Sequence, residues 1–131
     1  AGIVAAVTWI GATLPLYAVN LLLATDDELW ALRYPETHDL LWLDERAAPV
    51  QEHRDRRRRL RFGVDEPAPG IAVASEAMGD VAGWTPLASG ELLHVAADLT
   101  PTVTTVLPDP PAHQLTLEDL GIHAAASQAE K

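Results

Sequence analysis

Cysteine is absent from the 131 residues, and this absence excludes several kinds of chemistry at once. Without a thiol the chain has no disulfide, no thiolate ligand for a metal and no cysteine nucleophile of its own. A cysteine-free composition fits a reducing compartment, so we expect a cytoplasmic protein. Apolar residues make up 48% of the chain, which argues against disorder, and its length suits one modest domain with a core.

Basic residues are also scarce, since nine lysines and arginines face nineteen acidic residues and give a formal charge of −10. Six of the nine are arginines between positions 54 and 61, so that residues 51–61 carry about +4 and the remainder about −14. A basic loop for phosphate or RNA is one interpretation, but no aromatic side chain interleaves the arginines to stack bases. We favour a solvated loop that offsets nearby carboxylates, and we expect no nucleic-acid partner.

Charge is missing altogether from residues 1–25, which raises the question of a membrane span. A span needs about 20 apolar residues, whereas Pro15 and Asn20 interrupt this run and no basic residue flanks it. We therefore expect no membrane partner, and without a charged first region we expect no signal peptide. Residues 1–15 instead predict the end of a helix. Their start, with neither an initiator methionine nor a helix cap, suggests a piece of a longer protein.

Short apolar runs separated by polar or proline-rich breaks fill the middle of the chain. Such runs predict strands, and the Asp26-Asp27 pair between the first two predicts a tight hairpin. The expected strands are residues 16–24, 28–34, 39–43, 71–75, 91–97 and 102–107. The first of them is apolar at almost every position, so we expect neighbours to cover both of its faces.

The second expected strand alternates, with Trp30, Leu32 and Tyr34 on one face and Leu29 and Ala31 on the other. Strands that are apolar on both faces suit a sandwich of two sheets or a sheet covered by helices. We expect an α+β fold of mainly antiparallel strands. The few helical segments would leave part of the sheet uncovered, so the fold is expected to be incomplete in this chain.

The remaining segments are expected to lie outside the sheets. A polar, arginine-rich connection at 45–69 has room for one short strand at 59–64. A proline-rich break and tail occupy 108–131, where Thr116–Asp119 predicts a helical capping box that Gly121 interrupts. The tail after Ala124 is expected to fray.

None of the common catalytic loops is present, because the sequence lacks the G-x-S-x-G, G-x-x-x-x-G-K-[ST] and G-x-G-x-x-G patterns. The only serines are Ser75, Ser89 and Ser127. The histidines lie at positions 38, 53, 94, 113 and 123, with no pair at the helical spacing of a zinc site. We interpret His94 as a core or edge histidine of a strand, and we predict no metal and no cofactor.

Two stretches together resemble one family. "NLLLATDDELWALRYPETHDLLWL", residues 20–43, gives a strand, an acidic turn, a strand that ends in Arg-x-Pro, and a third strand. "IAVASEAMGDVAGWTPLASGELLHV", residues 71–95, gives "ASE" at the end of one strand, then "GW", then "GE" at the start of the next. In this order they resemble class II glutamine amidotransferase domains, closest to the stand-alone amidohydrolases of ergothioneine synthesis. Ala77, where that branch usually has proline, and the arginines of 54–61 depart from the pattern.

The resemblance implies an αββα sandwich of the N-terminal-nucleophile hydrolase kind. In that family an N-terminal cysteine attacks the side-chain amide of glutamine or of a γ-glutamyl amide, and the oxyanion and substrate groups also lie in the N-terminal half. Residues 1–131 would then be the C-terminal part of such a domain, with the missing N-terminal half as its partner. We assign no catalytic residue to this chain. On this interpretation Ser75 and Glu76 bond turn groups at a strand end, and Gly79, Gly83 and Gly90 permit the turns.

Two matters stay open at this point. A non-catalytic, β-rich module for protein interaction is the alternative function. The sequence leaves the oligomeric state undecided, with a homo-oligomer among the choices.

Overall fold

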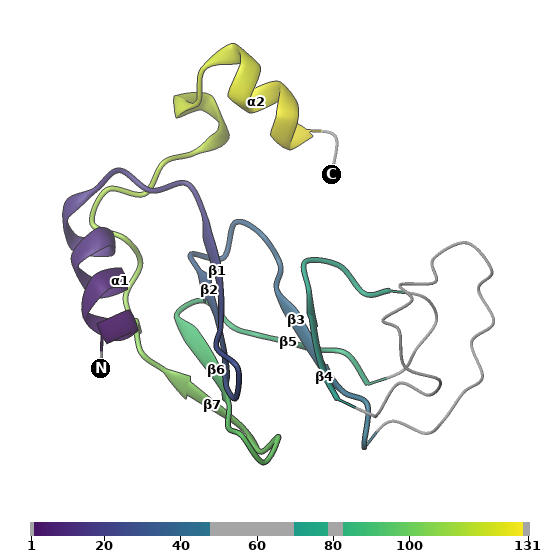
Figure 1. Ribbon diagram of the computed structural model, residues 1–131. Helices are drawn as coiled ribbons and strands as arrows, with labels where there is room; N and C mark the ends of the chain where they lie inside the picture. Colours follow the sequence, from purple (N-terminus) through teal and green to yellow (C-terminus); the bar gives the residue numbers. More distant parts are fainter. Residues whose placement is uncertain (1, 48–69, 79–82, 130–131) are drawn as a thin grey trace.

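The computed structural model describes residues 2–47, 70–78 and 83–129, which form strands and a few helical segments (Figure 1). The helical elements are α1 (Gly2–Thr13), η1 (Leu117–Asp119) and α2 (Ile122–Ala129). The strands are β1 (Val19–Ala24), β2 (Leu29–Tyr34), β3 (Leu41–Asp44), β4 (Ile71–Ala74), β5 (Thr85–Pro86), β6 (Glu91–Val95) and β7 (Pro101–Thr105). The expected helix end and six expected strands are confirmed within a few residues. The further strand expected at 59–64 lies outside the described residues.

The strands form two antiparallel sheets. One has the order β1-β2-β6-β7, in which β1 and β2 form the hairpin predicted around Asp26-Asp27. The other has the order β4-β3-β5. Its two-residue strand β5 was not predicted, because Thr85-Pro86 is too short to show a period and contains a residue that cannot donate to a ladder.

Helix α1 covers one face of the four-stranded sheet. A buried core joins Val7 of the helix to Leu32 and Tyr34 of β2, with Leu16 and Leu107 beside them. Close packing at this contact needs a glycine in the helix: a Cβ on Gly11 would lie 2.9 Å from the Tyr34 hydroxyl oxygen.

The opposite face of the same sheet packs against the three-stranded sheet. Ala31, Leu93 and Val95 of the larger sheet share a buried core with Leu40 and Leu87, which flank β3 and β5. The layers are therefore helix, sheet, sheet, and the class is α+β with mainly antiparallel strands. The alternation predicted for the second strand is confirmed, since Leu32 and Ala31 belong to different cores.

Strand β1 contradicts one expectation. The run 16–24 was predicted to be covered on both faces, but Leu22 and Leu23 are 55% and 43% exposed. The reason is topological: β1 is an edge strand of its sheet, and among the described residues its only neighbouring strand is β2. Hydropathy reports that a strand is apolar, but it does not report whether a neighbour covers it.

The C-terminal segment confirms one prediction and corrects another. The Asp119 carboxylate accepts a hydrogen bond from the Thr116 N–H at 2.7 Å, as in the predicted capping box, and it also accepts one from the Thr116 hydroxyl at 2.8 Å. Gly121 separates η1 from the next helix, as expected. The tail does not fray at once, because α2 continues to Ala129 on alanine-rich sequence of high helix propensity. Figure 1 shows η1 and α2 away from both sheets.

Within the described ranges, no helix combines the length and the apolar character that crossing a bilayer requires.

Candidate functional site

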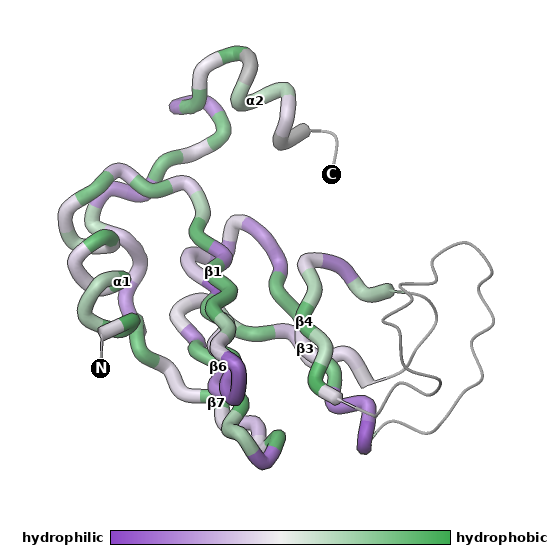
Figure 2. The backbone as a smooth tube through the Cα atoms, in the orientation of Figure 1, coloured by the Kyte–Doolittle hydropathy of each residue, from purple (hydrophilic) through white to green (hydrophobic). Residues whose placement is uncertain are grey.

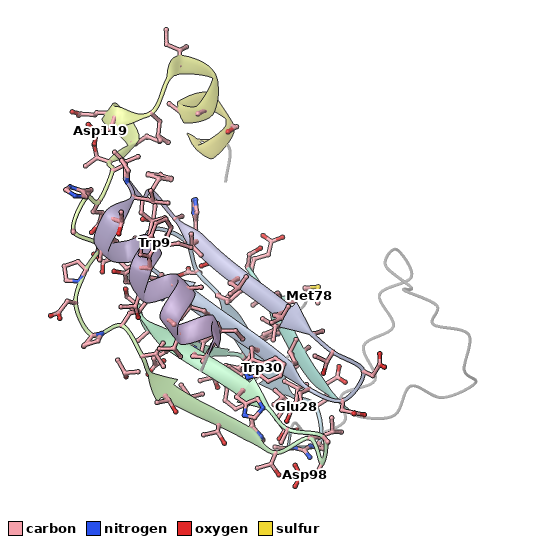
Figure 3. The ribbon with its side chains drawn as sticks, turned by 60° about the vertical axis from the view of Figure 1, so that its left-hand side comes forward. Trp9, Glu28, Trp30, Met78, Asp98 and Asp119 are labelled. Carbon is pink, nitrogen blue, oxygen red and sulfur yellow. The ribbon has the colours of Figure 1, made fainter. Side chains whose placement is uncertain are left out.

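A cleft of about 210 Å³ opens between the two sheets, at the end where the β1–β2 and β6–β7 turns lie. Its lining residues are mostly apolar, with one threonine and two acidic residues: Ala24, Thr25, Asp27, Glu28, Leu29, Ile71, Val95, Ala96 and Leu99. Figure 3 shows Glu28 and Asp98 together at this end of the molecule. The cleft is open to solvent and smaller than the pockets of about 300–1,000 Å³ that usually enclose small ligands.

Thr25 organises one wall of the cleft. Its hydroxyl oxygen accepts hydrogen bonds from the N–H groups of Glu28 and Asp27 at 3.0 and 3.3 Å. The Thr25 N–H also donates to the Glu28 carbonyl at 2.9 Å, which closes the hairpin. These bonds hold the two carboxylates in place and engage the hydroxyl in the turn, so Thr25 is not poised as a nucleophile.

Arg46 joins the two sheets beside the cleft through a hydrogen bond to the β6–β7 turn, and Asp44 holds its guanidinium in place. Two nitrogens of the Arg46 guanidinium donate to the Asp44 carboxylate at 2.9 and 2.8 Å, and Nη2 also donates to the Leu99 carbonyl. The hydrogen bond from Arg46 lowers the pKa of Asp44 below its usual value. Hydrogen bonds from Thr100 likewise lower the pKa of Asp98, with a smaller contribution from Arg46. This end of the molecule is therefore held by ionised carboxylates at neutral pH.

His94 and Glu28 lie on the face of the larger sheet that α1 covers in part. The His94 ring stacks on Trp30, with centroids 5.0 Å apart and an interplanar angle of 6°. Its Nε2 lies 3.5 Å from Glu28 Oε1, a separation that suits an ion pair when the imidazole is protonated. The geometry is not that of a hydrogen bond, and Nε2 has no such partner among the described residues. His94 is half-buried against Trp30 on β6, an inner strand, and its Nε2 has no hydrogen-bond partner in the described structure, so the expectation of a satisfied core or edge histidine is not confirmed.

The chemistry that this end can offer is limited. Asp27 at the cleft can accept hydrogen bonds or pair with a cation, whereas Glu28 directs its carboxylate toward His94. Among the described residues no three histidine, aspartate or glutamate side chains gather as a metal site. No hydroxyl in the cleft has an adjacent base, which acyl transfer by a serine or threonine would require.

Ser75 and Glu76 do not form a site in the described structure. Both follow β4 directly and are exposed. The expected bonds from their side chains to turn groups are not observed within the described ranges. Gly83 and Gly90 have positive φ angles of 113° and 77°, as the expected turns require, while Gly79 lies outside the described residues.

The Gly-Glu pair at the start of β6 is structural. The Glu91 carboxylate accepts a hydrogen bond from the Ala88 N–H at 2.7 Å and so closes the turn before the strand. The Gly90 N–H donates to the Arg33 carbonyl at 2.8 Å, and the Gly90 carbonyl accepts from Val106 at 2.9 Å. Gly90 thus joins β2, β6 and the end of β7 through its backbone.

The other sequence-predicted polar residues are scattered. His38 makes an edge contact with Tyr17, and the His113 carbonyl accepts a bond from the Leu16 N–H. Both lie at the opposite end of β1 from its turn. His53 and the arginines of 54–61 lie outside the described residues, as does the side chain of His123.

Arg33 was not singled out from the sequence as a structural residue, yet it is the most connected side chain near the cores. Its guanidinium donates to the carbonyls of Leu87, His38 and Glu36 at 2.7, 2.9 and 2.9 Å, and it pairs with Asp39 at 2.9 Å. One feature of the sequence could have identified Arg33 as a structural residue. No other lysine or arginine occurs within residues 1–45. A lone arginine at the end of an apolar strand is well suited to binding several turn carbonyls.

Comparisons with known proteins give no match: no protein-family model, no curated protein and no solved structure is similar to this chain.

Proposed function

We propose that this chain is the scaffold part of a class II glutamine amidotransferase-type domain, and that an upstream part of the same protein supplies the cysteine nucleophile. The observation that carries the proposal is the order of layers. A helix packs on an antiparallel sheet, and that sheet packs on a second antiparallel sheet through a shared core. An αββα sandwich would contain these three layers in this order, which supports the proposal.

The outer face of the smaller sheet supports the same proposal. Leu40 and Trp42 point toward the shared core, so Leu41, which is half-buried, lies on the opposite face of β3. Its partners in the register are Ala74 on one side and Pro86 on the other. This outer face is apolar, as a sheet face that receives a helical layer would be.

The positions of the quoted motifs in the fold also agree with the proposal. Residues 20–43 form the hairpin of the larger sheet and then cross into β3 of the smaller sheet. Residues 71–95 begin in the smaller sheet and return to the larger one as β6. Each motif thus contributes to both sheets, which is the role of a scaffold half in a sandwich.

In the proposed reaction the upstream cysteine thiolate attacks the side-chain amide carbon of glutamine or of a γ-glutamyl amide. Ammonia leaves after taking up the proton that the cysteine thiol has lost. Water then cleaves the thioester to give the free carboxylate. The described residues supply neither the nucleophile nor the oxyanion donors. Their contribution is to hold the two sheets together so that those groups keep their geometry.

The test is an assay of ammonia release from glutamine by the intact parent protein. We expect activity in the parent and its loss when the N-terminal cysteine is replaced by alanine. Ser75→Ala, an exposed position without a proposed role, serves as the matched control and should keep the parental rate. A reading frame without a Met-Cys start and a following "HNG"-like segment would overturn the proposal.

A non-catalytic interaction module is the second candidate, and the exposed edge of β1 favours it. An apolar edge strand can receive a strand from another protein by main-chain pairing. The glutamine assay separates the two candidates, because an interaction module would release no ammonia with or without a cysteine.

A further inference from the structure

The free backbone groups of β1 can be assigned from the ladder. The Thr25 N–H donates to the Glu28 carbonyl, and these two residues are opposite each other in the β1–β2 register. Because hydrogen-bonded and non-bonded pairs alternate along an antiparallel ladder, the odd-numbered residues of β1 bond to β2. Asn20, Leu22 and Ala24 therefore direct their N–H and C=O groups away from the sheet. Within the described ranges nothing bonds to those backbone groups.

The other edge of the same sheet differs. The Ala96 N–H donates to the Thr100 carbonyl, so the even-numbered residues of β7 bond to β6 and the odd-numbered ones face outward. The first outward residue is Pro101, which has no N–H and so cannot donate to an added strand. Such a proline protects the β7 edge against pairing, whereas β1 contains no proline and no charged residue.

We propose that β1 pairs with β1 of a second copy of this chain, antiparallel about a two-fold axis at Leu22. In this register Leu22 faces Leu22 of the second copy, and Asn20 faces Ala24 of the second copy. The outward N–H and C=O groups of Asn20, Leu22 and Ala24 then all have partners on the second copy. If the axis lay two residues further along the strand in either direction, some of these groups would have no partner. The inference does not depend on the proposed function, since it uses only the free groups of β1.

The side chains suit this register. Leu22, 55% exposed in one copy, meets its own equivalent across the axis, and Leu23, 43% exposed, meets Leu21 of the second copy. The nearest carboxylate, Asp26, would face Ala18 of the second copy, so like charges do not meet. Figure 2 shows β1 as a mostly apolar strand that leads into a hydrophilic turn. Pairing through a two-fold axis closes the assembly at two copies.

Sedimentation velocity of the 131-residue chain over a range of concentrations tests the proposal. We expect a reversible monomer–dimer equilibrium. Leu22→Lys places two like charges directly opposite each other and should raise the dissociation constant of the dimer by on the order of tenfold. Leu22→Glu should do the same, and an equal mixture of the two variants should restore the dimer, because only a two-fold axis at this residue brings position 22 against itself.

Val103→Lys is the matched control. Val103 lies on the opposite edge strand, also at an outward-facing backbone position, on the same face as Leu22 and 38% exposed. It should leave the dimer unchanged, and circular dichroism should show that all variants are folded. The proposal is overturned if the chain is monomeric throughout, if it forms open-ended aggregates, if Leu22→Lys dimerises like the unmodified chain, or if the mixture stays monomeric.

Discussion

Gly90 shows how one residue can decide the path of three strands. It has a positive φ of 77°, and a Cβ at this position would collide with the Leu107 carbonyl group. Its N–H and C=O bond to Arg33 and Val106, so the backbone cannot move away without losing these contacts. The glycine is needed both for its conformation and for the close approach of the chain.

Gly90→Ala is therefore expected to lower the free energy of unfolding by about 2–4 kcal/mol, from strain at positive φ and from overpacking. Urea titration measures this difference. Gly70→Ala is the control, because a Cβ at Gly70 meets no atom within 4 Å and the change should stay within about 0.5 kcal/mol. Equal stability of the two variants would contradict the role assigned to Gly90.

At the scale of elements, local sequence specified most of the strands and did not specify their surroundings. The hairpin at Asp26-Asp27 and the alternation of Leu32 and Ala31 followed from composition and period. The coverage of β1 did not, because exposure depends on which strands are neighbours. The cleft was not predicted either, since its walls come from 24–29, Ile71 and 95–99, which only folding brings together.

The end of β2 depends on Arg33, whose guanidinium satisfies the carbonyls of Glu36, His38 and Leu87. Arg33→Lys keeps the charge but replaces a planar fork with a single ammonium, so some of these half-buried carbonyls lose their donor. We expect a loss of about 2 kcal/mol in the free energy of unfolding, measured by thermal or urea denaturation.

The control for this variant is Asp39→Asn, which removes the carboxylate that pairs with Arg33. That side chain is 69% exposed, and an exposed ion pair contributes at most about 1 kcal/mol. If Asp39→Asn cost as much as Arg33→Lys, the ion pair rather than the carbonyl contacts would stabilise the turn.

At the scale of the whole molecule, the two sheets are joined by their shared core and by a polar link at the cleft end. Asp44 at the end of β3 binds Arg46, which reaches the Leu99 carbonyl in the β6–β7 turn. The pKa of Asp44 is lowered in the folded state by the hydrogen bond from Arg46. Its stabilising contribution is therefore present above the unfolded carboxyl pKa and is lost as the pH falls through the lower folded value.

Asp44→Asn tests this link, because asparagine cannot titrate. We expect the variant to be less stable than the unmodified chain at neutral pH, and the difference to shrink as the pH falls below about 4. Thermal denaturation across this range measures the difference. Asp26→Asn, in an exposed turn and without an ion pair in the described structure, is the control and should change the stability at neutral pH by no more than about 0.5 kcal/mol. A difference for Asp44→Asn that does not change with pH would contradict the link.

Local sequence patterns predict the class of the fold, the hairpin, most strand positions and the capping box, because period, turn residues and caps act over a few neighbouring residues. Which strand lies at the edge, where the cleft opens and what Arg33 binds follow from the packing of distant segments. These features depend on contacts between segments far apart in the sequence, such as Arg33 and Leu87, which are 54 residues apart, and local patterns contain no information on such pairs. The free edge of β1 is one such feature, since a strand has an edge only within a sheet.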